Sequence, residues 1–135
     1  MIILIKKNFI WNVVGSTFSA LNSLFFMIIV TRINGVDDAG LFTFAFSTAC
    51  LFYVVGIYSG RTYQVTDEEY DDNAYFYNRV ITCFTMLVLS LLFCFVRGYD
   101  FNKISVIMAL VLFKVLEAFS DTLYGIIQKN DQLYK

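Results

Sequence analysis

Long uncharged apolar runs constrain this chain more than any other feature. A helix needs about 20 mostly apolar residues to cross about 30 Å of hydrocarbon. Uncharged runs of that length, or nearly so, cover residues 9–31, 39–60 and 80–96, and a fourth apolar run, 104–127, contains charges. Hydrophobic residues make up 59% of the 135 residues, and the mean hydropathy is +0.66, above the range of soluble domains. The sequence therefore predicts a membrane protein with four spans.

The four runs read as helices. Backbone polar groups in lipid must be bonded within the protein, which leaves helices or a closed barrel, and the run 80–96 lacks the alternation of a barrel strand. We therefore predict an all-α polytopic membrane bundle in which residues 1–135 form a single transmembrane domain. Gly35 is suited to end the first helix and Asp38 to cap the second, so the first two spans should pack as antiparallel neighbours.

Basic residues outside the spans indicate the orientation. Four spans place both termini and the loop 61–79 on one side of the membrane. That side has six basic residues against three on the other: Lys6, Lys7, Arg61, Arg79, Lys129 and Lys135 against Arg32, Arg97 and Lys103. Because Lys and Arg concentrate on the cytoplasmic side, both termini are predicted to be cytoplasmic.

The fourth run carries three charges inside the predicted span. Lys114, Glu117 and Asp121 fall within about 60° of one another around a helix, so they share a face. Lys114 lies about 15 Å along the axis from Ile104, close to the midplane, where a charge costs about 2.5 to 3.5 kcal/mol. Such groups usually mark a substrate or ion pathway, which favours a hydrated cavity. A neutral pair that only fixes helix packing is the alternative.

Polar residues of the first span also favour a hydrated pathway. Asn12, Gly15, Ser16 and Ser19 fall on one side of a helix. Asn12 and Ser16 are therefore candidates for the same pathway. Small and hydroxylated residues also form helix contact surfaces in lipid, and the two interpretations can hold together.

Other classes of function find little support. The chain has no histidine, its three cysteines lie in apolar runs without metal-ligand spacing, and it has no basic run for nucleic acid. The acidic run DEEYDD lacks the spacing of a calcium loop and reads as a solvated turn. With no nucleophile motif and no phosphate-binding glycine loop, we predict no enzymatic activity, no metal and no cofactor.

Three stretches together resemble a known family. They are TRINGVDDAGLFTFAFS, RTYQVTD and EAFSDTLYGIIQKNDQLY. In this order they are similar to the amino-terminal part of bacterial polysaccharide flippases, exporters of lipid-linked oligosaccharides related to the multidrug and toxin extruders. The resemblance runs over nearly the whole chain. Since family members have about twelve spans in two halves, it implies that this chain corresponds to the first four spans of a longer transporter.

The resemblance also implies a function. The chain would take part in moving an undecaprenyl-diphosphate-linked sugar repeat from the inner to the outer leaflet of the bacterial cytoplasmic membrane, for surface polysaccharide such as O-antigen or capsule, by alternating access. Its expected partners are the lipid bilayer, the lipid-linked oligosaccharide, a coupling proton or cation, and the remaining helices or other subunits. Lys114 would offer positive charge to the diphosphate or to an acidic sugar, and Glu117 and Asp121 would tune that charge or carry the coupling ion.

The RTYQVTD stretch falls at the predicted cytoplasmic mouth. Arg61, Gln64 and Asp67 would there admit the head group, or Arg61 would simply anchor a helix end. Two other functions stay open: a complete four-span exporter that works as a homo-oligomer, and a membrane scaffold whose charged face pairs with another protein.

Overall fold

The computed structural model describes residues 2–58, 60–66 and 72–129, and within these ranges only the backbone of residues 2–9, 12, 16, 19, 20, 23, 65, 66, 72 and 129. Five helices make up the described regular structure: α1 (Ile2–Asn34), α2 (Val36–Ile57), α3 (Gly60–Thr66), α4 (Asp72–Val96) and α5 (Phe101–Lys129). The all-α prediction is therefore confirmed for this part of the chain. Each long helix extends a few residues beyond at least one end of the apolar run that predicted it.

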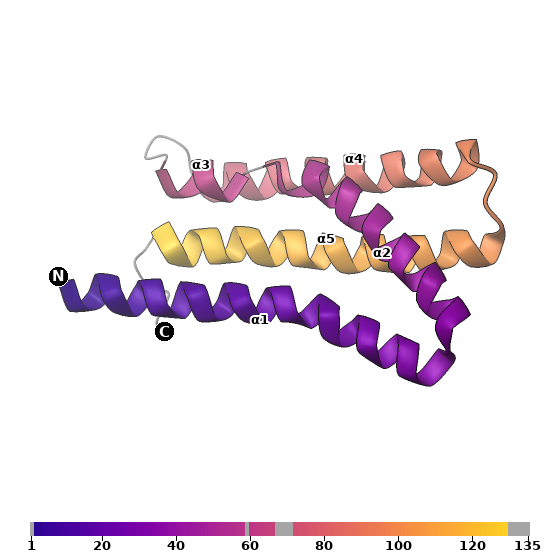
Figure 1. Cartoon of the computed structure of the whole chain (residues 1–135). Coiled ribbons are helices and arrows are strands. Elements are labelled where there is room, and N and C mark those ends of the chain that lie inside the picture. The colour runs from indigo at the N-terminus through magenta and orange to yellow at the C-terminus, as the bar shows by residue number, and fades with distance from the viewer. Residues whose placement is uncertain (1, 59, 67–71, 130–135) are drawn as a thin grey trace.

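The four long helices run alternately in opposite directions (Figure 1). The start of α1, the end of α5, the short α3 and the start of α4 lie at one end of the bundle, and the α1–α2 and α4–α5 connections lie at the other. By length and composition, two described stretches can cross a membrane: Val36–Gln64, which contains α2 and part of α3, and Asn73–Val96 of α4. The apolar stretch Leu24–Asn34 of α1 is shorter.

A three-helix core of α2, α4 and α5 holds the bundle together. Small residues on α2 let the other two helices approach closely, as is common between helices in lipid. The fully buried side chains come from all three helices: Ala45 and Ala49 of α2, Met86 and Cys94 of α4, and Ile107 and Val111 of α5. Figure 1 shows α2 crossing α4 and α5 diagonally.

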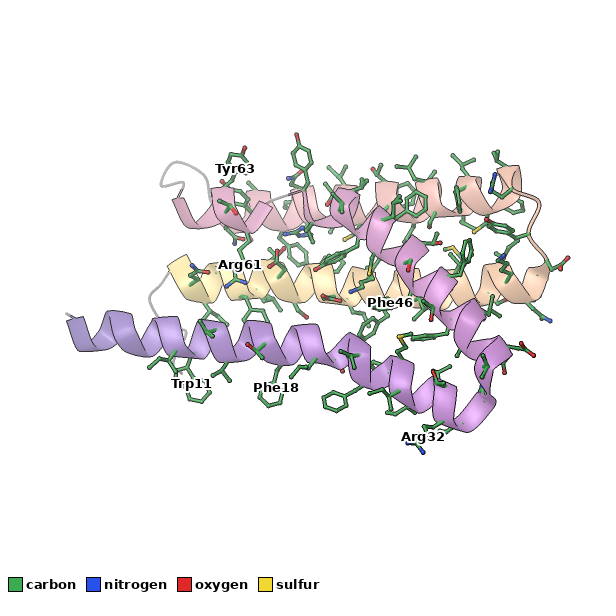
Figure 2. All side chains as sticks on the ribbon, viewed as in Figure 1. Trp11, Phe18, Arg32, Phe46, Arg61 and Tyr63 are labelled. Atoms are coloured by element: carbon green, nitrogen blue, oxygen red, sulfur yellow. The ribbon has the colours of Figure 1, made fainter. Side chains whose placement is uncertain are left out.

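Helix α1 is the least integrated element. It packs against α2, and Phe26 meets Phe113 of α5 edge-on at 5.9 Å between ring centroids. Trp11 and Phe18 point away from the bundle (Figure 2) and are more than half exposed. An apolar helix with so much exposed surface needs either lipid or further protein around it.

The connection between α1 and α2 consists of Gly35 alone. Its φ of +92° lies in the region that favours glycine, which confirms the expected role of Gly35 in this turn. The prediction that Asp38 caps α2 is wrong, because the cap position is occupied by Gly35, three residues earlier, without a side-chain hydrogen bond. Asp37 and Asp38 lie in the first turn instead, where their charges favour the positive end of the helix dipole.

An aromatic clamp fixes the end of the bundle opposite α3. The Lys103 Nζ lies 4.3 Å from the ring centroid of Phe44 and 4.3 Å from that of Tyr99. The two rings meet edge-on, so the ammonium of α5 is held between α2 and the α4–α5 connection. These contacts fix the position of α5 relative to α2.

Candidate functional site

The charged face of α5 divides into two clusters with different partners. At mid-helix, Lys114 Nζ donates a hydrogen bond of 2.7 Å to Glu117 Oε2. The sequence predicted that these residues share a helix face, and a neutral pair was the alternative to a hydrated cavity. The Lys114 side chain is 9% exposed and that of Glu117 31% exposed, so the carboxylate is the more accessible member of the pair.

Two aromatic rings of α2 complete the surroundings of the Lys114 ammonium. Its Nζ lies 5.1 Å from the Phe46 ring centroid and 4.9 Å from the Tyr53 centroid. Phe46 can be followed in Figure 2 where α2 crosses α5. The negative faces of the rings and the single carboxylate together stabilise a buried cation that would otherwise be costly. We call Lys114 and Glu117 the central pair.

Asp121 belongs to a second cluster, one turn closer to the end that bears α3. Its Oδ2 accepts a hydrogen bond of 3.1 Å from Arg79 Nη2, and its Oδ1 lies 3.6 Å from Arg61 Nη1. One carboxylate thus forms salt bridges with two guanidinium groups from different helices. Asp121 therefore shares a helix face with Lys114 and Glu117 but pairs with neither.

Arg79 is the centre of the second cluster and was missed as a site residue from the sequence. It is only 4% exposed, and besides Asp121 it donates to Thr122 Oγ1 at 2.6 Å and to the Gly56 carbonyl at 2.8 Å. The three bonds tie α4 to α5 and α2. The position of Arg79 along the helix could have indicated this role. Arg79 directly precedes the third apolar run, and Asp121 lies near the end of the fourth, so antiparallel helices would place both at a similar depth in the membrane.

Two residues of α3 join the same cluster. Arg61 reaches from α3 toward α5 (Figure 2), where its Nε and Nη2 donate to Gln128 Oε1 at 3.1 and 2.8 Å. Gln64 is 1% exposed, and its amide lies against Gly125 of α5. We call this cluster the polar junction: Arg61, Gln64, Arg79, Asp121, Thr122 and Gln128.

Gly125 admits the Gln64 amide because it has no side chain. A Cβ at this position would meet the Gln64 Oε1 and lie 2.9 Å from its Cδ, closer than real Cβ contacts. We therefore expect Gly125→Ala to push the amide away from α5 and to speed amide hydrogen exchange in α3. The matched control is Gly40→Ala, whose Cβ would meet nothing within 4 Å. Equal exchange rates in both variants would contradict this account of Gly125.

Three candidates from the sequence remain. The side chains of Asn12 and Ser16, and all of Asp67, lie outside the described residues. The acidic run 67–72 also lies outside the described residues, apart from the backbone of Asp72. Among the side chains that the structure describes, no group of three or more His, Cys, Asp or Glu residues could hold a metal ion.

The fold and the two clusters define an all-helical chain with two membrane-compatible helices and ion pairs inside its helix bundle. In sequence, the chain is similar to the capsular polysaccharide biosynthesis protein CapF of Staphylococcus aureus, with 27% identity over 128 residues. The match covers 94% of this chain and 32% of CapF, so the chain spans about a third of the length of this curated relative. No protein-family profile matches the chain, and no solved structure does.

Proposed function

We propose that this chain is part of a membrane transporter that moves a lipid-linked oligosaccharide across the bacterial cytoplasmic membrane for polysaccharide assembly. The observation that carries the proposal is the similarity along 94% of the chain to a protein of capsular polysaccharide biosynthesis. The ion pairs inside the helix bundle support it, since intramembrane charges usually mark a pathway. Transport of this kind changes no covalent bond.

In this proposal all four long helices cross the membrane, with both termini in the cytoplasm. Helix α5 carries charges, but the central pair and the polar junction neutralise most of them inside the protein, which lowers the cost of placing them in lipid. Helix α1 exposes large apolar side chains along its described length, as a lipid-facing or partner-facing span does.

The central pair is the proposed contact for a polar cargo. The Glu117 carboxylate is the more exposed member and holds the buried Lys114 ammonium at 2.7 Å. An anionic head group, such as a diphosphate, would compete with Glu117 for this ammonium. Protonation of Glu117 would release Lys114 to the anion, which gives the pair a role in proton coupling as well as in binding.

The test of this role is transport by a full-length relative. The residues equivalent to Lys114 and Glu117 are replaced together, Lys114→Met with Glu117→Gln, and export of the polysaccharide is measured in cells that lack the native transporter. We expect export to fall at least tenfold while the protein level in the membrane stays the same. Export equal to wild type would rule out the cargo role and favour a scaffold. The native mass of the purified chain checks the other alternative, a small homo-oligomer with transport activity of its own.

Accessibility to water separates a hydrated cavity from a sealed pair. In a chain with Cys50, Cys83 and Cys94 replaced by alanine, Glu117→Cys should react with a charged, membrane-impermeant thiol reagent in open membranes. The matched control is Leu116→Cys, because Leu116 is 67% exposed on the surface that the proposal assigns to lipid or partner helices. We expect reaction at position 117 to be at least tenfold faster than at position 116. Protection of both positions would indicate a dry ion pair.

A further inference from the structure

A small polar cavity lies beside the polar junction, at the end of the bundle that bears α3. Its volume is about 10 Å³, at the lower limit for a single water molecule. It lies between α3, α4, α5 and the end of α2, and neither member of the central pair lines it. Its lining includes Gln64 of α3, Asn78, Arg79 and Thr82 of α4, Thr122 of α5, and Tyr58 and Tyr75.

Gln64, which lines this cavity, carries a buried donor that has no hydrogen-bond partner among the described residues. Among the described residues, the Gln64 Nε2 forms no hydrogen bond although Gln64 is 1% exposed. Of the Gln64 amide atoms, the oxygen is the one nearest to a Cβ built on Gly125, and the nitrogen lies 3.5 Å from that position. Leaving a buried donor unsatisfied costs about 1 to 3 kcal/mol, which is why such groups in proteins are usually bonded to protein or to ordered water.

The other groups around the cavity can serve the same ligand. The Thr122 hydroxyl accepts from Arg79 Nε and donates to the Ala118 carbonyl, and it keeps one lone pair. The Thr82 hydroxyl lies within bonding distance of the Gly56 carbonyl and of the Arg79 carbonyl. As a donor to either carbonyl, it keeps its own lone pairs for a second partner. A ligand that accepts from Gln64 and donates to a threonine hydroxyl fits this arrangement.

We propose that this cavity binds one ordered water molecule that links Gln64 of α3 to the threonine hydroxyls of α4 and α5. A water accepts and donates at once, and the cavity volume is at the lower limit for one water molecule. A chloride ion is larger and cannot donate, and the neighbouring Arg79 already has Asp121 as its counter-ion. With this water, two residues of α3 are bonded to the bundle: Arg61 directly and Gln64 through the solvent molecule.

The direct test is nuclear magnetic resonance of the full chain in lipid bicelles. Magnetisation transfer from water to the side-chain amide of Gln64 should show a long-lived contact. The exposed amide of Asn102, at the opposite end of the bundle, should show only short-lived hydration. The absence of a long-lived water signal at Gln64 would overturn the proposal. A signal that changes when chloride is replaced by gluconate would assign the cavity to an anion and overturn it equally.

A variant provides an independent readout. Gln64→Met removes the donor, so the water loses one partner and amide exchange in α3 should accelerate about fivefold, the change expected for one net hydrogen bond. Gln128→Met is the matched control, because Gln128 belongs to the polar junction but does not line the cavity. It should leave the water signal at Gln64 unchanged. Slower exchange in Gln64→Met would mean that a dry, unsatisfied donor had been removed, and would overturn the proposal.

Discussion

Asp121→Asn should destabilise the chain by about 3 kcal/mol, because removal of one partner of a buried ion pair leaves the other charge uncompensated. Arg79, the partner that stays behind, is 4% exposed and has no other carboxylate within 4.0 Å among the described residues. The bonds from Arg79 to Thr122 and Gly56 remain but are neutral. The measurement is the free energy of unfolding of the chain in mixed micelles, titrated with a denaturing detergent.

Asp100→Asn is the matched control for this prediction. Asp100 is exposed near the opposite end of the bundle and forms no salt bridge with any described residue, so its replacement should change stability by less than about 0.5 kcal/mol. Arg61→Met should fall between the two, since its 3.6 Å contact with Asp121 is longer and its side chain is 29% exposed. Similar losses for Asp121→Asn and Asp100→Asn would contradict the structural role of the polar junction.

Glu117→Gln should destabilise the chain by a similar amount, about 3 kcal/mol. It leaves the Lys114 ammonium, whose side chain is 9% exposed, beside the rings of Phe46 and Tyr53 and without a carboxylate within 4.0 Å among the described residues. The double variant Lys114→Met with Glu117→Gln removes both charges, so it should recover most of the lost stability. Unfolding free energies of the two single variants and the double variant form a double-mutant cycle that measures the coupling.

Lys103→Met tests whether the effect is specific to the central pair. Lys103 also contacts two aromatic rings, but it has no carboxylate within 4.0 Å among the described residues. Its replacement should cost only about 1 kcal/mol, the range of a partly exposed cation–π contact. If the double variant lost as much stability as the sum of the two single variants, the charges of Lys114 and Glu117 would not stabilise each other.

The stability cycle and the transport test answer different questions. The double variant keeps the fold by removing both charges, so any loss of export in a full-length relative then reports on the cargo and not on folding. A double variant that is stable and exports normally would leave Lys114 and Glu117 as a packing device. A stable variant that fails to export would place the pair on the pathway.

Several features were predictable because they depend on neighbours along the chain. The apolar runs predicted the helices, since the pattern of hydrophobic residues within one segment decides whether it can form an apolar helix. Gly35 predicted the turn, because its positive φ is a local property of one residue. The pairing of Lys114 with Glu117 follows from a spacing of three residues on one helix.

The partners of Asp121 and the burial of Gln64 depended on the tertiary structure. Arg79 is 42 residues away from Asp121 in sequence, and helical periodicity says which residues share a face but not which helix lies opposite that face. That choice follows from close packing of α2 through Ala45 and Ala49, which brings α4 and α5 together. The sequence alone determined the helices and their charges. Only the packing of those helices decided which charges neutralise one another, because ion pairs between helices form where side chains meet in space.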